Sequence, residues 1–192
     1  MHITEIRRNS CTLVMNERKC AFLRGVNVNG RKIMMSEMCD VFRSAGMNEV
    51  SSILATGNIV FSSSMDNKTL QGILKDFITS YYSSEFELFL KDNDEIRSIL
   101  NGNPFASSKD LHVYVFIAND GMEKELGKLF DDIDPTPQEE GVIANGTFYW
   151  RVTKGNTLTS GFSKILGRKD MRDKFTSRNI NTIEKVMESM SK

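Results

Sequence analysis

The chain has 192 residues, of which 40% are hydrophobic and 26% are charged, a composition typical of a soluble globular protein with a substantial core. Its 25 Lys and Arg residues balance its 25 Asp and Glu residues, so the formal net charge is zero. That balance disfavours tight non-specific binding to nucleic acid, which needs a surplus of cations, although it leaves room for a local basic patch.

The cysteines and histidines argue against a disulfide framework and against a structural zinc site. Cys11, Cys20 and Cys39 are odd in number and form no CxxC pair, and His2 and His112 are the only histidines. No apolar run approaches the length of a membrane span, and the first nineteen residues contain no hydrophobic segment of a secretory signal. We therefore expect reduced cysteines, no metal, no cofactor, no membrane partner and a cytoplasmic location.

Residues 1–19 precede the first clear strand, and we treat them as an N-terminal extension. Residues 20–100 then follow the order β-α-β-β-α-β, which is the split βαβ or ferredoxin-like arrangement. The elements are a strand at 20–28, a helix capped by Ser36 and ending at Gly46, a hairpin around Gly57, an amphipathic helix capped by Asp66 or Asn67, and a strand at 86–90. A short helix near 94–100 closes this first half as a connector.

Residues 101–192 repeat that order except for its last strand. The elements are a central strand at 111–118, a helix at 121–130, a hairpin within 141–152 that turns at Asn145-Gly146, a helix at 159–167 and a C-terminal helix from about 180. The second half is therefore predicted as β-α-β-β-α plus the C-terminal helix. The fold class is α+β, with two ferredoxin-like halves whose antiparallel or mixed sheets are covered by helices.

Arg24 is the most unusual residue, because it shares a strand face with Phe22 and Val26 although arginine is rarely buried without a partner. One interpretation is an anion-binding guanidinium at the end of the strand, with Arg31 and Lys32 nearby. The other is an internal salt bridge, or a strand edge at which the guanidinium reaches water. The sequence leaves both open.

Two other polar segments have the same pair of interpretations. The segment 56–58 is interpreted either as a plain hairpin turn or as a turn that presents Asn58 to a ligand. The basic segment 159–179 is a solvated surface of mixed charge, or a surface that contacts phosphates. Its two aromatic residues, Phe162 and Phe175, fall short of an RNA-stacking platform.

No catalytic constellation can be assembled from these residues, so the sequence does not decide whether the chain is an enzyme. His112 lies in a strand that is apolar on both faces, which is typical of a core histidine. The acids Asp131, Asp132 and Asp134 fit a surface loop. The chain has no GxSxG or HExxH motif and no acidic pair with metal spacing.

Four segments, in this order, resemble a bacterial family known as domain of unknown function 1697. They are "FLRGVNVNGRK", "TGNIVFSS", "NPF…LHVYVF" and "SK…TSRNINTIEKV", and they span residues 20–187. The resemblance implies an α+β fold with ferredoxin-like halves. It also implies that the following residues match the family's polar motif positions: Arg24, Gly25, Asn27, Lys32, Gly57, Asn58, Lys164, Arg178 and Asn179.

This sequence departs mildly from the family pattern at three positions, and the family name supplies no activity. Thr56 stands where serine is usual, Ile180 where an aromatic residue is usual, and Asn29 where glycine is usual. The loss of that glycine bears on how closely a ligand can approach the first turn.

From these residues we expect a site for a small anionic or nucleotide-like ligand, in which cations supply charge and amides supply directional hydrogen bonds. The expected ligand-binding residues are Arg24, Asn27, Lys32, Asn58, Lys164, Arg178 and Asn179. Two alternatives stay open. One is a nucleic-acid-binding module, by analogy with other ferredoxin-like sheets. The other is a structural or interaction protein whose polar motifs hold the two halves together.

Overall fold

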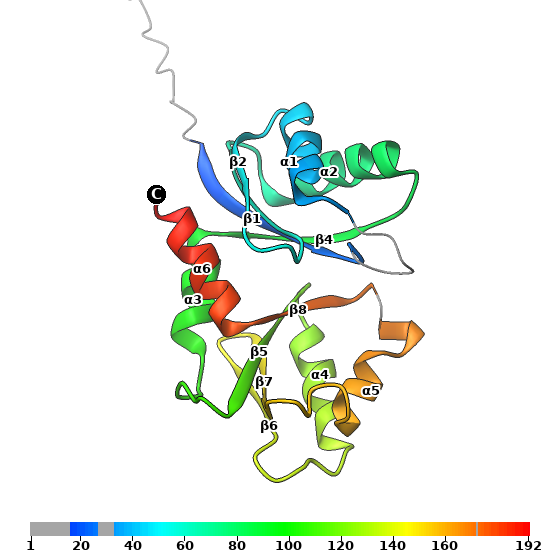
Figure 1. Ribbon diagram of the computed structural model, residues 1–192, viewed down its shortest axis with the longest axis vertical. Coiled ribbons are helices and arrows are strands. Elements are labelled where there is room, and N and C mark those ends of the chain that lie inside the picture. The colour runs from blue at the N-terminus through cyan, green and yellow to red at the C-terminus, as the bar shows by residue number, and fades with distance from the viewer. Residues whose placement is uncertain (1–15, 27–32, 172) are drawn as a thin grey trace, which may run out of the picture.

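Two four-stranded antiparallel sheets, stacked one above the other in Figure 1, form the framework of the protein. The computed structural model describes residues 16–26, 33–171 and 173–192. The first sheet has the order β2-β3-β1-β4, with β1 Glu17–Arg24, β2 Asn48–Ser52, β3 Asn58–Ser63 and β4 Glu87–Asp92. The second has the order β6-β7-β5-β8, with β5 Leu111–Ala118, β6 Glu140–Ala144, β7 Thr147–Thr153 and β8 Phe175–Asn179.

The two halves repeat one arrangement, in which β-α-β-β-α-β is followed by one further helix. The helices are α1 Met35–Ser44, α2 Asn67–Tyr82, α3 Asn93–Gly102, α4 Met122–Asp131, α5 Gly161–Leu166 and α6 Ile180–Met190, with a 3₁₀ turn at Lys169–Met171. When the strands are numbered from the start of each half, both sheets have the order 2-3-1-4. The prediction of an α+β fold with two related halves is confirmed.

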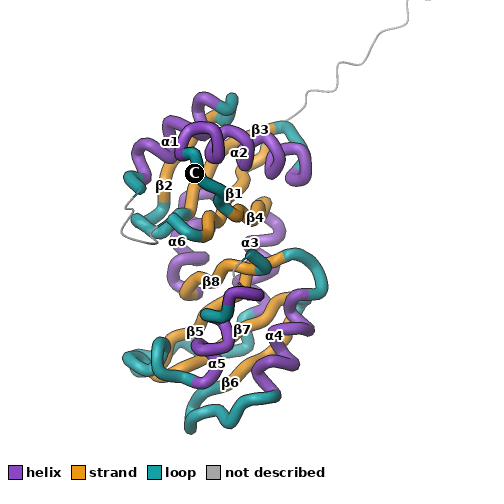
Figure 2. Tube along the Cα trace, turned by 90° about the vertical axis from the view of Figure 1, so that its right-hand side faces the viewer, coloured by secondary structure: helices purple, strands orange, loops and turns teal. Residues whose placement is uncertain are grey.

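Three layers of core follow from this repeat. The first lies between the first sheet and helices α1 and α2, and the third lies between the second sheet and helices α4 and α5. The middle layer joins the halves, because α3 and α6 pack together there and contact the inner faces of both sheets (Figures 1 and 2). Phe22 of β1 and Val115 of β5 are both fully buried in this middle layer.

Local sequence signals account for several element boundaries. Asp66 caps α2, where its Oδ1 accepts a hydrogen bond of 3.0 Å from the backbone N–H of Thr69. Asn145 and Gly146, with φ of 48° and 71°, form the turn between β6 and β7. Positive φ at both residues is what a two-residue hairpin of this kind requires.

Three boundaries differ from the predictions. The first strand begins at Glu17 and ends at Arg24, so residues 17–19 belong to β1 and not to an N-terminal extension. Helix α1 begins at Met35, and Ser36 lies inside it and does not cap it. Residues 1–15, and the segment 27–32 at the predicted end of the first strand, lie outside the described residues.

The prediction that a helix replaces the closing strand of the second half was wrong. Phe175–Asn179 forms β8, which pairs with β5 from Ala118↔Phe175 to Tyr114↔Asn179. Four of its five residues are polar, so the apolar alternation that marks a strand is missing. Pairing with the central strand β5 determines its conformation instead.

None of the described helices combines the length and the apolar composition needed to cross a membrane.

Candidate functional site

Arg178 lies on β8 of the second half, and its guanidinium reaches across to the first half. Nε donates to Oδ1 of Asn58 at 2.5 Å, and Nη2 donates to the carbonyl oxygens of Leu23 at 2.7 Å and Gly57 at 3.3 Å. Nη1 donates to Oγ1 of Thr176 at 2.6 Å and to the carbonyl of Ser177 at 2.9 Å, both on its own strand. These acceptors match the five N–H donors of a guanidinium, and all of them are neutral.

Asn58 is fully buried at the start of β3, and its amide group is used entirely within the protein. Its Nδ2 donates to the carbonyl of Ile53 at 2.9 Å and to Oγ1 of Thr56 at 3.0 Å, while Oδ1 accepts from Arg178. Gly57, which precedes it, has a φ of +74°. That left-handed conformation turns the chain so that the Gly57 carbonyl and the Asn58 side chain face the same guanidinium.

Arg24 approaches the same place from the end of β1. Its guanidinium carbon lies 4.7 Å from the centroid of the Phe175 ring, and Nη1 donates to the Phe175 carbonyl. Both contacts cross from the first half to the second. Both are internal contacts of the protein, one to an aromatic ring and one to a backbone carbonyl. We call the following group the arginine junction: Leu23, Arg24, Gly57, Asn58, Phe175 and Arg178.

The electrostatics of the junction are dominated by burial. Burial lowers the pKa of Arg178 to about 10, and the like charge of Arg24 lowers this pKa as well. Cys20 interacts electrostatically with Arg178, and burial raises the pKa of the Cys20 thiol, so the thiol is neutral at neutral pH. Arg178 stays charged there, and none of the acids in the described part of the chain forms an ion pair with it.

The structure brings together three of the seven predicted ligand-binding residues, Arg24, Asn58 and Arg178. Asn179 caps α6 instead, where its Oδ1 accepts from the backbone N–H of Asn181 at 3.0 Å. Lys164 lies exposed on α5, and the hydrogen bonds described for Asn58 and Arg178 do not include it. Asn27 and Lys32 lie outside the described residues.

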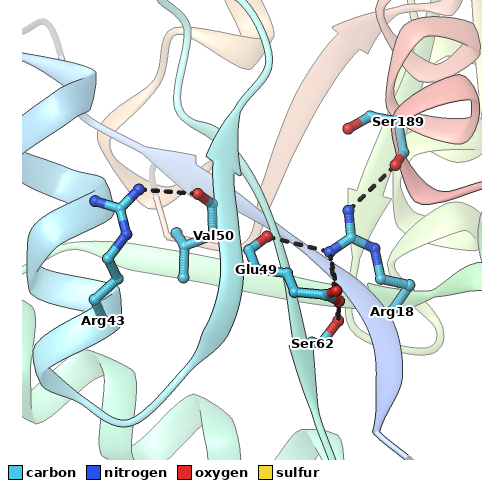
Figure 3. Close-up of polar contacts among 6 residues, drawn as sticks. All are labelled: Arg18, Arg43, Glu49, Val50, Ser62 and Ser189. Atoms are coloured by element: carbon cyan, nitrogen blue, oxygen red, sulfur yellow. Dashed lines mark hydrogen bonds and ion pairs between the residues drawn. The ribbon is translucent and has the colours of Figure 1, made fainter. Parts of the chain in front are cut away.

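A second arginine that joins the halves was missed by the sequence analysis (Figure 3). Nη2 of Arg18 donates to the carbonyl of Ser189 at 3.2 Å, near the end of α6. Nη1 of Arg18 lies 3.1 Å from the carbonyl of Glu49, 3.5 Å from its carboxylate and 3.3 Å from Oγ of Ser62. The predicted N-terminal extension includes Arg18, and no motif around this residue signals a half-buried role.

The described residues contain no group of three or more His, Cys, Asp and Glu side chains placed to hold a metal ion. His112 is half-buried, with Nδ1 3.3 Å from the hydroxyl of Tyr114. Its side chain therefore has a polar partner within its own strand, but it is half-buried and does not belong to the core as predicted.

Residues 16–149, more than half of the chain, match the model of a family described as "Protein of unknown function (DUF1697)". The chain belongs to the DUF1697 family. The DUF1697 match ends within β7, so the C-terminal residues that we compared with the family, among them Arg178, lie beyond it.

Among solved structures, this DUF1697 chain is similar to the conserved bacterial protein SP0830 from Streptococcus pneumoniae, with a TM-score of 0.75 and 19% identity over 92% of this chain and 99% of that one. At this identity the similarity establishes the fold alone. A structure described as that of an unknown protein from Galdieria sulphuraria also matches, at 11% identity over 92% of this chain and 90% of that one, but its TM-score of 0.24 carries no argument. No curated protein sequence matches the chain significantly.

Proposed function

We propose that this chain binds a small anionic ligand, such as a phosphate or a nucleotide, at the arginine junction beside Arg24. One observation carries the proposal: the partly buried guanidinium of Arg178 has only neutral hydrogen-bond acceptors among the described residues. The residues that are not described contain a single acid, Glu5. A cation that is partly removed from water and not balanced by a carboxylate favours the approach of an anion.

The two arginines have different roles in this proposal. All five donors of Arg178 are used, so Arg178 contributes its charge and fixes the position of its neighbours without touching the ligand. Arg24, at the end of β1, is the residue that we expect to contact the anion. Asn27 and Lys32, which follow Arg24 in the chain, are expected to add an amide group and a charge around the ligand.

A titration calorimetry experiment tests the proposal. Inorganic phosphate, AMP and ATP are titrated into the full chain, with adenosine as a probe that lacks phosphate. We expect the phosphate-bearing probes to bind, with an affinity that falls as salt is added. Arg24→Gln should weaken binding by tenfold or more, whereas Arg97→Gln should not, because Arg97 is exposed and pairs with Asp94 elsewhere.

Two outcomes contradict the proposal. In the first, none of the phosphate-bearing probes binds the wild-type chain. In the second, they bind but Arg24→Gln leaves the affinity unchanged.

A structural role for the junction is the second candidate, and the saturated donors of Arg178 favour it. In that case Arg24→Gln lowers the melting temperature, and no probe raises it in either protein.

A nucleic-acid-binding module would need an open sheet face with exposed aromatic residues. Helices or the other half of the protein cover both faces of each sheet, so the described residues offer no such open face. Oligonucleotides are included in the same titration to test this alternative.

A cytoplasmic location is also part of the proposal. Cys20 and Cys39 are free and buried thiols, as is common in a reducing compartment.

A further inference from the structure

The internal repeat of the protein makes Lys91 the counterpart of Arg178. In the first sheet Cys20 of β1 pairs with Lys91 of β4, and in the second sheet Val115 of β5 pairs with Arg178 of β8. Lys91 directly precedes Asp92, which caps α3, just as Arg178 directly precedes the residue that caps α6. Lys91 and Arg178 therefore occupy equivalent positions in the two halves.

The place that Arg178 occupies also has a counterpart. Arg178 binds where the end of β1 meets the turn at Gly57, directly before β3. In the second half, Ala118 at the end of β5 and the turn at Gly146, directly before β7, line the same cavity. The two glycines have nearly the same φ, +74° and +71°.

Arg178 fills the first of these two equivalent places, whereas its counterpart Lys91 leaves the second one open. At the second place the structure has a cavity of about 230 Å³, whose lining includes Lys91, Ala118, Gly146 and Thr147. The lysine does not fill this cavity, because its Nζ bonds to Oε1 of Glu95 on α3, at 2.6 Å.

The charge of the cavity lining suits a cation. Glu95, Asp120 and Glu123 line the cavity together with Lys91, which gives three acids against one base. The pair formed by Lys91 and Glu95 leaves the other two carboxylates without a described ion pair. By register, Ala118 corresponds to Leu23, and Gly146 and Thr147 correspond to Gly57 and Asn58.

We propose that this cavity binds the guanidinium group of a small-molecule ligand, in the place that Arg178 occupies in the other half. The carbonyls of Ala118 and Gly146 and the side chain of Thr147 provide the acceptors, as their three counterparts do for Arg178. Asp120 and Glu123 balance the charge of the ligand. The site is separate from the arginine junction and takes a ligand of opposite charge, so it does not depend on the function proposed there.

The test uses agmatine, a small guanidinium compound, in titration calorimetry with the full chain. 1,4-Diaminobutane, which replaces the guanidinium by an amine, is the comparison. We expect agmatine to bind the wild-type chain more tightly than 1,4-diaminobutane does, because the site is shaped for a planar group with several donors. Equal affinity for the two probes, or no heat with agmatine, would overturn the proposal.

Lys91→Arg is the decisive variant, because it supplies the cavity with an internal guanidinium. This variant should bind agmatine at least tenfold more weakly and melt at a higher temperature than the wild type. Lys124→Arg, an exposed change on α4, is the matched control and should leave both quantities unchanged. Undiminished binding by Lys91→Arg refutes the assignment.

A second variant keeps the test decisive if Lys91→Arg does not fold. Asp120→Asn alters an exposed residue and removes one carboxylate of the cavity. We expect it to weaken agmatine binding at least threefold, and an unchanged affinity would count against the site.

Discussion

Nε of Arg178 donates a hydrogen bond of 2.5 Å to Oδ1 of Asn58, and this bond joins the last strand of the second half to the first sheet. The two residues are 120 positions apart in the chain. The same guanidinium also bonds to the carbonyls of Leu23 and Gly57. Polar residues that suggested a ligand site in the sequence therefore hold the two halves together, whether or not a ligand binds beside them.

Replacing Arg178 should destabilise the protein strongly. Arg178→Met removes the guanidinium donors, so Oδ1 of Asn58 and the carbonyl of Leu23 lose this partner, while the carbonyl of Gly57 keeps the backbone N–H of Leu23. We expect the free energy of unfolding to fall by about 3 kcal/mol. Urea unfolding measures this change.

Arg168→Met is the control, since Arg168 is exposed and pairs with Asp170. This substitution should lower the free energy of unfolding by less than about 1 kcal/mol. Equal effects of the two changes would contradict a role for Arg178 in joining the halves.

The two equivalent turn glycines should respond differently to alanine. A Cβ at Gly57 would lie 3.1 Å from Cβ of Leu23 and 3.1 Å from Cγ2 of Val26, whereas a Cβ at Gly146 would meet nothing within 4 Å. Both changes force alanine into a left-handed conformation, at a cost of about 1 kcal/mol. Gly57→Ala adds a steric cost and displaces the acceptors of Arg178, so we expect a total of about 2–3 kcal/mol in urea unfolding.

The comparison between these two variants is its own control, because the backbone strain is shared. If Gly146→Ala destabilises the protein as much as Gly57→Ala does, crowding at the junction is not the cause.

Most of the fold could be predicted from the sequence, because its signals are local. Leu70, Leu74 and Ile78 recur at helical spacing and are fully buried in α2, and Asn145-Gly146 forms the predicted turn. Strand β8 could not be predicted, because its conformation depends on pairing with β5, more than 50 residues earlier in the chain.

The candidate site could be predicted only in part, for the same physical reason. The sequence identified Arg24, Asn58 and Arg178 as polar residues of interest, but their mutual contacts depend on how the halves pack. Arg18 gave no signal, since its partners Glu49 and Ser189 lie in other elements. The correspondence between Lys91 and Arg178 appears only when the registers of the two sheets are compared.

Tyr149 should make stability depend on pH in the alkaline range. Its hydroxyl donates to the carbonyl of Ile99 at 2.7 Å, and burial raises its pKa to about 12 from 10. Because the folded pKa lies above the unfolded one, the contribution of the neutral phenol is fully present below pH 10 and is lost as the pH rises from about 10 to 12.

Tyr149→Phe isolates this effect. Over the same range, the lowered pKa of Arg178 makes the unfolded chain bind more protons, which raises stability with pH in both proteins. The difference in unfolding free energy between wild type and Tyr149→Phe removes that common contribution. This difference should shrink by about 2 kcal/mol between pH 9 and pH 12 in urea titrations, and a constant difference would contradict the raised pKa.

Arg18 should control the stability of the end of α6. Its guanidinium bonds to the carbonyl of Ser189 in the last turn of that helix and to the carbonyl of Glu49 on β2 (Figure 3). A cation at a helix C-terminus also interacts favourably with the helix dipole. Arg18→Gln should therefore speed hydrogen exchange at the amide of Ser191, which donates to Met187, by about tenfold.

Arg43→Gln is the matched control, because Arg43 bonds to the carbonyl of Val50 on the same strand β2 and is not among the partners described for α6. If the two variants exchange equally fast at Ser191, the last turn of α6 does not depend on Arg18, and the middle core alone holds that helix against the first sheet.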